Sequence, residues 1–355
     1  MLSQKETHLP LRRAVKVGAL QIGGGAPVSV QSMLSIRAED VPGNIVQAKA
    51  LEAAGCELLR AACPDKATIQ LFAALKENLR IPVVADIHFD YRLALECAAV
   101  GVDKIRINPG NIGASDRVKA VADACRQKQI PIRIGVNGGS LEKEILAKYG
   151  SPNPEAMCES ALGHIRLLEQ YDFTDIVVSL KSSHPAATVA AYRLLAQACD
   201  YPLHLGLTEA GTVRLGILKS AAAIGSLLLD GLGDTIRVSL TADPIEEVRT
   251  AINLLRALEL RRTGPVVISC PTCGRTRIDL ISLASQVEEA LLPCTKPITV
   301  AVMGCAVNGP GEAREADIGL AGGIGECLLF KKGTPLYKVP EAEALSALLR
   351  EIESL

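Results

Sequence analysis

Three cysteines and one glutamate near the end of the sequence have a spacing that suits metal ligands. Cys270 and Cys273 form a C-x-x-C pair in "SCPTCG", and Cys305 begins the loop "CAVNGPGEA", which contains Glu312. A C-x-x-C pair places two thiolates on one tight turn, close enough to bind one metal ion or two neighbouring irons of a cluster. The spacing favours an iron–sulfur centre. Zinc and unligated thiols remain open, although structural zinc usually takes a second C-x-x-C pair, which this sequence lacks.

The fourth ligand decides what such a centre does. Three thiolates leave one iron of a [4Fe–4S] cluster to be completed by another group, and a carboxylate such as Glu312 can be displaced by a substrate oxygen without loss of the cluster. The glycines and proline of "NGPGE" (308–312) allow turns that bring Glu312 toward Cys305. On spacing alone, a solvated loop glutamate remains the simpler alternative for Glu312. Cys294 or Cys327 as fourth ligand would give a closed cluster for electron transfer only.

A second group of polar residues stands where predicted β-strands end. The cations among them would repel one another unless an anion lay between them, and the planar fork of arginine suits phosphate. A small molecule with two phosphates is the simplest neutraliser, although an individual arginine can instead pair with a carboxylate at the rim. The residues of this group are Arg60, Asp86, His88, Arg106, Asn108, Arg133, Asn137, Lys181, Glu209, Arg237 and Ser239.

Two members of this group are candidates for proton transfer. Glu209, in "LTEAG", is a carboxylate expected beside Lys181 and Arg237, where it can donate or accept a proton. The alternative is a salt bridge that orients Lys181. His88, in "DIHFD", can act as a base, as a hydrogen-bond donor to substrate, or as a partner of Asp86, and the sequence leaves these alternatives open.

The elements that must position these residues alternate regularly. Eight short β-rich runs, each followed by a helical pattern, predict a (β/α)8 TIM barrel over residues 1–262. A doubly wound sheet is disfavoured because no strand is followed by GxGxxG at a helix start. Ser115 and Asp243 are expected helix N-caps, with Pro244 in the first turn. The runs are 26–33, 56–63, 81–89, 102–108, 130–137, 175–181, 202–209 and 234–240.

The pattern changes after Arg262. A strand before the C-x-x-C turn, an amphipathic helix over 277–292, a strand over 296–304 and a glycine-rich strand region over 316–325 follow one another. A hairpin around "KKGTP" and a terminal helix over 341–355 complete the pattern. Residues 263–355 are therefore predicted to form a small α+β domain that carries the metal centre.

Composition limits the possible partners. The net charge is −1 and aromatic residues make up 3% of the chain, which argues against nucleic acid and against an anionic membrane surface. The longest apolar run, 220–229, is half of a membrane span, and the polar start of the sequence lacks a secretory signal. A cytoplasmic protein with reduced thiols is expected. Six further cysteines, in apolar segments, are predicted to be core residues: Cys56, Cys63, Cys97, Cys125, Cys158 and Cys199.

Several long motifs in order resemble one enzyme family. They are "VADIHFDYRLAL", "RINPGNIG", "IPIRIGVNGGSLEK", "PLHLGLTEAG", "DTIRVSL", "CPTCGR" and "MGCAVNGPGEAREADIG". Together, from about residue 10 to 340, they resemble the 4-hydroxy-3-methylbut-2-enyl diphosphate synthases, the iron–sulfur enzymes of the methylerythritol phosphate route to isoprenoids. This chain is similar to the shorter, two-domain form of the family.

The resemblance implies an activity and a set of roles. It implies reductive ring opening and dehydroxylation of 2-C-methyl-D-erythritol 2,4-cyclodiphosphate, with two electrons from a flavodoxin or ferredoxin. It implies a homodimer in which the cluster domain of one chain faces the barrel of the other, and Glu209 as the acid/base group. The implied ligands of the [4Fe–4S] cluster are Cys270, Cys273, Cys305 and Glu312. The implied substrate-binding residues are Arg60, Arg106, Arg133, Asn137, Lys181, Arg237, Ser239 and Asn308, and His88 is added from its position at a strand end.

Two other functions fit parts of the pattern. A barrel lyase or transferase acting on a phosphorylated substrate would use a structural zinc in the small domain, and it would bind zinc and lack visible absorption. A non-catalytic iron–sulfur redox sensor would have no need of a cation-rich barrel mouth and would show no turnover with any reduced donor.

Overall fold

The computed structural model describes residues 11–305, 311 and 313–355. The chain divides into two compact units, Met1–Leu260 and Arg261–Leu355. Each unit has a hydrophobic core of its own.

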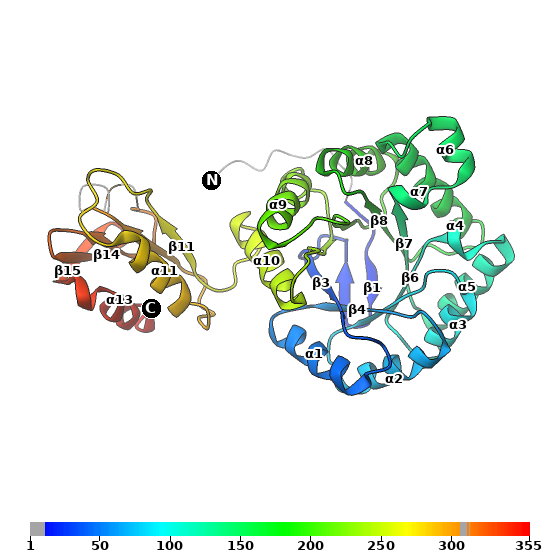
Figure 1. Cartoon of the computed structure of the whole chain (residues 1–355), viewed down its shortest axis with the longest axis horizontal. Helices are drawn as coiled ribbons and strands as arrows, with labels where there is room; N and C mark the ends of the chain where they lie inside the picture. The colour runs from blue at the N-terminus through cyan, green and yellow to red at the C-terminus, as the bar shows by residue number, and fades with distance from the viewer. Residues whose placement is uncertain (1–10, 306–310, 312) are drawn as a thin grey trace. The chain divides into compact units, whose positions relative to one another are not determined.

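The first unit is a barrel of eight parallel strands ringed by helices (Figure 1). Neighbouring strands pair in chain order, β10 pairs with β3, and a bridge between Val178 and Leu203 closes the ring. All eight strands fall within the predicted runs, so the predicted TIM barrel is confirmed. The strands are β3 (Ser29–Met33), β4 (Leu58–Ala62), β5 (Val83–Asp86), β6 (Lys104–Ile107), β7 (Ile132–Asn137), β8 (Ile176–Lys181), β9 (His204–Leu205) and β10 (Thr235–Ile236).

Helices cover the outside of the barrel and bury its apolar strand faces. None of the helices that the structure describes is long and apolar enough to span a membrane. The helices are α1 (Val41–Ala53), α2 (Ile69–Asn78), α3 (Tyr91–Val100), α4 (Pro109–Ile112), α5 (Ser115–Lys128), α6 (Lys143–Tyr149), α7 (Pro154–Glu169), α8 (Pro185–Ala198), α9 (Val213–Leu229) and α10 (Pro244–Ala257). Short 3-10 turns lie at Lys66–Thr68 and Gly138–Ser140.

One of the two predicted N-caps is right and the other is wrong. Asp243 caps α10, where its side chain accepts a hydrogen bond from the backbone N–H of Ile245, and Pro244 is the first helical residue. Ser115 does not cap α5, because it is already helical and Ala114 occupies the cap position. The reason is local: Gly113, at φ +97°, ends α4 and turns the chain one residue earlier than the pattern suggests.

A short hairpin, which the sequence pattern did not predict, covers the amino-terminal end of the barrel. Strands β1 (Val15–Val17) and β2 (Leu20–Ile22) pair antiparallel. Val17 and Ile22 pack against Leu58 and Val84, which point inward near the beginnings of β4 and β5. The hairpin therefore closes the end of the barrel opposite the one where its strands finish.

The second unit is a five-stranded mixed sheet with helices on one face. Strands β11, β12 and β13 are parallel, and β14 and β15 continue the sheet antiparallel. Helices α11 and α13 pack on one face around Val287 and Leu348. This confirms the predicted α+β domain. Its elements are β11 (Val266–Ser269), α11 (Leu280–Ala290), β12 (Thr299–Met303), β13 (Ile318–Gly322), β14 (Glu326–Lys331), β15 (Thr334–Pro340), a 3-10 turn (Glu341–Glu343) and α13 (Ala344–Glu353).

The predicted hairpin around "KKGTP" joins β14 and β15. Lys332 and Gly333 form its two-residue turn with φ of +48° and +76°. Two successive positive φ values are typical of a type I′ turn, whose twist matches that of the flanking strands.

Candidate active site and metal centre

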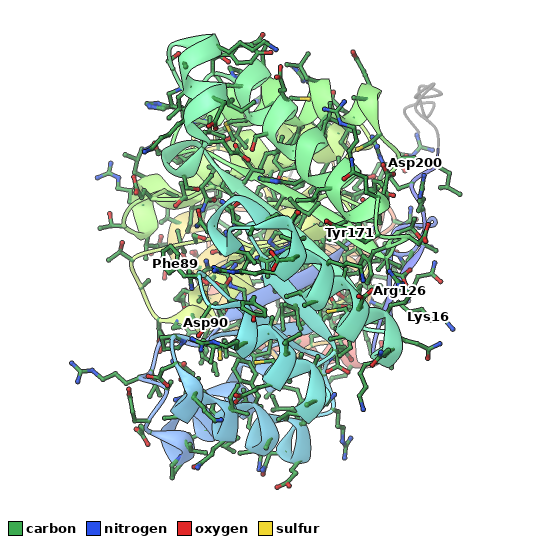
Figure 2. The ribbon with its side chains drawn as sticks, turned by 90° about the vertical axis from the view of Figure 1, so that its right-hand side faces the viewer. Lys16, Phe89, Asp90, Arg126, Tyr171 and Asp200 are labelled. Atoms are coloured by element: carbon green, nitrogen blue, oxygen red, sulfur yellow. The ribbon has the colours of Figure 1, made fainter. Side chains whose placement is uncertain are left out.

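The predicted strand-end residues, with the exception of Asn108, line one pocket of about 230 Å³ in the barrel, whereas Asn108 caps α4. Parallel strands all finish at the same end of the barrel, so the last residues of each converge there. Figure 2 shows the barrel from the side: Phe89 and Asp90, which follow β5, lie at one end, and Lys16, Arg126, Tyr171 and Asp200 lie toward the other. The pocket is lined by Arg60, Asp86, His88, Arg106, Arg133, Asn137, Ser179, Lys181, Leu207, Thr208, Glu209, Arg237 and Ser239.

Asp86 is the carboxylate around which this pocket is organised. Its Oδ1 lies 3.1 Å from the NH1 of Arg106 and its Oδ2 lies 3.5 Å from the Nε of Arg60. Burial alone would raise the pKa of Asp86, but Arg60, Arg106 and Arg133 outweigh it and hold that pKa far below its usual range. Asp86 is therefore ionised and fixes two guanidinium groups at the pocket floor. The Nε2 of His88 is 3.8 Å from Asp86 Oδ2, which favours the partner role for this half-exposed histidine.

Arg237 has a carboxylate partner from outside the pocket. Its NH2 donates to both carboxylate oxygens of Glu247 on α10 at 3.3 Å, and Glu247 also accepts from the backbone N–H of Leu240. For Arg60, Arg106 and Arg237 the alternative of pairing with a carboxylate is thus partly correct. These pairs orient the guanidinium groups, yet Nε of Arg106 and Nε of Arg237 stay without a hydrogen-bond partner among the described residues.

Arg133 and Lys181 form no ion pair with any carboxylate in the described part of the chain. Both are buried, and the Nε and NH1 of Arg133 have no hydrogen-bond partner there. Burial, with repulsion from neighbouring cations, lowers the pKa of Arg133 and of Lys181 well below the ordinary values. Burial of a cation without a counter-charge is unfavourable in free energy, so a bound anion would stabilise these two residues in their charged forms.

The charge of the pocket can be counted from its lining. Five cations and the two carboxylates Asp86 and Glu209 line it, which leaves an excess of three positive charges. Glu247, which pairs with Arg237 from behind, reduces this excess to two. The pocket is polar and concave, and its arrangement fits a small molecule with two negative charges.

Glycine at one strand position lets a cation lie close to the backbone. A Cβ on Gly135 of β7 would stand 2.4 Å from the Nε of Arg106, whereas one on Gly206, just after β9, would meet the backbone carbonyl of Arg237 at 2.8 Å. The guanidinium of Arg106 thus occupies the space where a side chain at position 135 would be.

Glu209 stands at the rim in a strained backbone conformation. Its φ is +53°, which is uncommon for a residue other than glycine, and its side chain is exposed. The alternative salt bridge to Lys181 is not found among the described ion pairs. The carboxylate is therefore free to meet a bound molecule, as an acid/base group must be.

Several residues near the pocket were not singled out in the sequence. Ser179 precedes Lys181 by two residues and so lies on the same face of β8, which the alternation of side chains along a strand could have predicted. Leu207 and Thr208 lie in the loop after β9. The ion pair between Glu247 and Arg237 had no sequence signal, because it joins a helix to a strand end.

The loop after β7 is tied to α7 by the half-buried carboxylate of Glu142. Glu142 accepts from Ser160 at 2.7 Å and lies 2.6 Å from the Nε2 of His164. Burial opposes ionisation of Glu142, but hydrogen bonds to its carboxylate, chiefly from His164, lower its pKa to about 2. In the same loop Ser140 accepts from the side chain of Asn108 at 3.3 Å. These contacts hold the segment that follows Asn137.

The cysteine turn and the end of β12 are joined in the second unit. The backbone N–H of Gly304 donates to the Sγ of Cys270 at 3.2 Å, and Arg277 N–H donates to the carbonyl of Gly304 at 3.0 Å. Cys305 follows Gly304 directly. The register that pairs Ser269 with Val302 is what places the C-x-x-C turn at this end of the sheet.

Cys273 lies exposed on the same turn. Hydrogen bonds from the backbone and side chain of Arg275 lower the pKa of its thiol. An N–H bond to Cys270 and a lowered pKa for Cys273 both favour thiolates, the form that binds metals. This soft donor set fits an iron–sulfur centre.

The predicted ligand set is not complete within the described residues. No three His, Cys, Asp or Glu side chains of that part of the chain gather closely enough to hold a metal ion by themselves. Glu312 and Asn308 lie outside the described residues, so both remain predictions.

The two alternative thiol ligands have other surroundings. Cys327 is fully buried in the core beneath α11 and α13, and burial raises its pKa to about 11. It lies on β14, two strands from β12, which is about 10 Å at the usual strand spacing. Cys294 is half-buried against the same core. Of the six predicted core cysteines, five are buried and Cys199 is half-buried.

Comparison with known sequences gives matches along both units. Residues 12–252 match the family described as the GcpE TIM-barrel domain, and residues 266–354 match the GcpE protein C-terminal domain. A protein of Geobacter sulfurreducens named 4-hydroxy-3-methylbut-2-en-1-yl diphosphate synthase (flavodoxin) is 55% identical over 343 residues, 97% of this chain and 97% of that protein. A protein of Bacillus pumilus with the same name is 54% identical over 349 residues, 98% of this chain and 94% of that protein.

Two of the similar solved structures cover about the length of the barrel unit. Dihydropteroate synthase from Thermus thermophilus has a TM-score of 0.51 at 15% identity, over 70% of this chain and 99% of that chain. N-acetylneuraminic acid synthetase from Leptospira borgpetersenii has a TM-score of 0.51 at 13% identity, over 70% and 90%. At such identities the likeness concerns the fold and not the chemistry.

Proposed function

This chain belongs to the GcpE family, and from that premise we propose that it converts 2-C-methyl-D-erythritol 2,4-cyclodiphosphate to (E)-4-hydroxy-3-methylbut-2-enyl diphosphate. The observation that carries the proposal is the barrel pocket, with its excess of positive charge and its two buried cations that have no carboxylate partner among the described residues. A cyclic diphosphate has one ionised oxygen on each phosphorus and is therefore a dianion. Its two negative charges match the excess of two positive charges that remains when the pocket lining and Glu247 are counted together.

The chain's own residues bind and orient this dianion. Arg133 and Lys181, which find no carboxylate in the described part of the chain, are the contacts that a phosphate would satisfy. The other phosphate contacts are proposed to come from Arg60, Arg106 and Arg237, whose carboxylate partners fix them in place. Hydrogen bonds to the substrate are proposed for His88, Asn137, Ser239 and Asn308.

Glu209 is proposed to supply the proton. The ring C–O bond to phosphate breaks, a hydroxyl leaves as water, and two electrons and one proton are consumed, so the dianion becomes a trianionic diphosphate. An exposed carboxylate at the pocket rim, with no partner among the described residues, supports its assignment as the group that protonates the departing hydroxyl.

We further propose that Cys270, Cys273, Cys305 and Glu312 hold a [4Fe–4S] cluster. When bound, the cluster supplies single electrons and a Lewis-acidic iron. The hydrogen bonds that join the C-x-x-C turn to Gly304 support the three thiolates. The burial of Cys327 in the core supports a ligand other than a fourth cysteine.

A flavodoxin or ferredoxin is proposed as electron donor, and the names of the relatives support flavodoxin. We also propose a homodimer in which the cluster unit of one chain serves the barrel of the other. Helix α10 runs back along the barrel for about 21 Å and ends away from the pocket, and only residues 258–265 separate it from β11. Reduced thiolate ligands are consistent with a cytoplasmic location.

The first experiment measures iron and acid-labile sulfide per chain, with the visible spectrum, in protein purified without oxygen. The wild type is compared with the double variant Cys294→Ser, Cys327→Ser. About four irons and four sulfides in both would support Glu312 at the fourth position. Loss of the cluster in the variant alone would make a cysteine the fourth ligand, and zinc in both would overturn the redox function.

Turnover tests the roles of single residues. Glu209→Gln is expected to keep the cluster and the affinity for the cyclodiphosphate while losing turnover, and near-wild-type turnover would exclude the acid role. Arg133→Ala is expected to weaken substrate binding, and unchanged binding would refute the anion pocket.

A further inference from the structure

A second layer of polar side chains lies inside the barrel, beneath the pocket. Side chains two apart on a strand point to the same face, and three residues of this layer precede inward-facing residues of the pocket wall by two: Lys104 before Arg106, His204 before Gly206, and Thr235 before Arg237. With Ser29 and Gln31 of β3, all five residues of the layer are at most 1% exposed.

Lys104 is the basic residue of this layer whose charged form has neither an ion pair nor a hydrogen bond among the described residues to offset its burial. Its Nζ is buried without a hydrogen-bond partner, and it takes part in no ion pair that the described residues form. Both ring nitrogens of His204 and both polar atoms of the Gln31 side chain are unpartnered in the same way. An ammonium group in such a place loses its hydration and gains no counter-charge, so the neutral amine is favoured.

The charged groups around Lys104 have its own sign. Arg60 reaches it from β4 and Arg133 from β7, and the titratable neighbour from β9 is His204. Asp86, on the adjacent strand β5, is occupied by Arg60 and Arg106. Burial first, and then Arg133 and Arg60, lower the pKa of Lys104 well below the ordinary lysine value.

We propose that Lys104 is a neutral amine in the free enzyme and binds a proton from solvent when a dianionic substrate occupies the pocket above it. The inference rests on the proposed function, because it takes the cyclodiphosphate as the anion. The two negative charges offset the repulsion by Arg60 and Arg133, and the protonated amine becomes one more counter-charge beneath the phosphates. Binding and protonation then favour each other, as linkage requires.

The neighbouring bases are less suited to this role. The guanidinium of Arg133 begins with so high a pKa that it stays charged even when buried. His204 is surrounded by Arg133, Lys181 and Lys104, so its imidazole stays neutral. Lys181, whose pKa is lowered by the same causes, is the competing candidate, and the variants described below distinguish it from Lys104.

The test is calorimetric titration of the cluster-loaded enzyme with the cyclodiphosphate, without an electron donor so that no turnover occurs. Titrations in HEPES and in Tris at the same pH differ in heat in proportion to the protons taken up. The wild type is expected to take up about one proton per substrate bound, and its dissociation constant should rise up to tenfold for each pH unit across the titration range.

Two variants identify the residue. Lys104→Met is expected to remove the uptake, and the control Lys49→Met, at an exposed position on α1, is expected to keep it. Equal heats for the wild type in both buffers would overturn the proposal, and so would undiminished uptake by Lys104→Met, which would place the proton on Lys181 or another group. Should the methionine variant fail to fold, Lys104→Gln serves the same comparison.

A second measurement needs no ligand. Because the folded-state pKa of Lys104 is lowered, the unfolded chain binds more protons, and stability should rise with pH between neutrality and about pH 10. Urea unfolding of the wild type is expected to show this rise more steeply than Lys104→Met, and equal slopes would refute the neutral amine. If the slopes differ while the cyclodiphosphate gives no heat, the proposed function fails and the neutral lysine stands.

Discussion

Gly135→Ala tests whether the position of one guanidinium controls the pocket. The new Cβ would stand 2.4 Å from Nε, 2.7 Å from NH2 and 3.0 Å from Cζ of Arg106, whereas ordinary contacts begin near 3.4 Å. The guanidinium must therefore retreat by about 1 Å. It cannot do so freely, because Asp86 holds its NH1 at 3.1 Å and the side chain is only 10% exposed.

The size of the effect follows from the bonds that such a shift would break. A retreat of about 1 Å from Gly135 breaks the 3.4 Å contact of the Arg106 NH2 with the Gly135 carbonyl, disturbs the NH1–Oδ1 pair with Asp86 and misplaces the donors offered to a phosphate. A hydrogen bond to a charged group contributes about 1.5–3 kcal/mol, which corresponds to roughly 10- to 100-fold in affinity. The variant should therefore raise KM for the cyclodiphosphate by about that factor, although the substitution adds only one methyl group.

The assay is steady-state turnover by cluster-loaded enzyme with reduced methyl viologen as donor, together with calorimetric affinity for the substrate. Gly139→Ala is the matched control, because a Cβ there meets no atom within 4 Å and the residue follows the same strand. An unchanged KM and affinity in Gly135→Ala, with the cluster intact, would mean that the position of Arg106 does not matter for binding.

Three further outcomes are expected. Asp86→Asn should destabilise the fold by about 3 kcal/mol at pH 7. Because the folded-state pKa of Asp86 is lowered, this difference should shrink progressively as the pH falls below about 4, and a constant difference in urea unfolding would contradict the ion-pair explanation. Asp243→Ala should cost about 1 kcal/mol in urea unfolding and Ser115→Ala close to nothing, and equal losses would contradict the observed caps. Glu142→Gln should raise KM and lower the stability at pH 7. Because the folded-state pKa of Glu142 is lowered to about 2, this stability difference should shrink as the pH falls from about 4.5 toward 2, whereas unchanged kinetics would show that its contact with His164 has no role in holding the loop.

The barrel and most of its pocket could be predicted because both depend on local patterns. Each strand is a short β-rich run, and the parallel arrangement alone brings Arg106, Lys181 and Ser239 to one end. The pairing of Glu247 with Arg237 and of Glu142 with His164 could not be predicted, since each joins segments whose distance depends on packing between elements.

Weak local signals explain the other differences. The hairpin of β1 and β2 has strands of three residues, too short for alternation to be distinguished from chance. Ser115 has the side chain of an N-cap, but the backbone set by Gly113 gives the cap position to Ala114. In the second unit the C-x-x-C pattern predicted the turn on which Cys270 lies. Spacing alone could not decide whether Glu312 or a cysteine is the fourth cluster ligand.

The hairpin that covers the amino-terminal end of the barrel has a consequence for exchange with solvent. Val17 and Ile22 leave the polar layer around Lys104 without a route through that end, so water and protons reach it through the opening that the substrate also uses. A substrate in the pocket then blocks the route, so the proton that Lys104 binds must enter together with the substrate. Removing residues 15–22 would create a second route, and deuterium exchange in the barrel interior would then continue when the pocket is full.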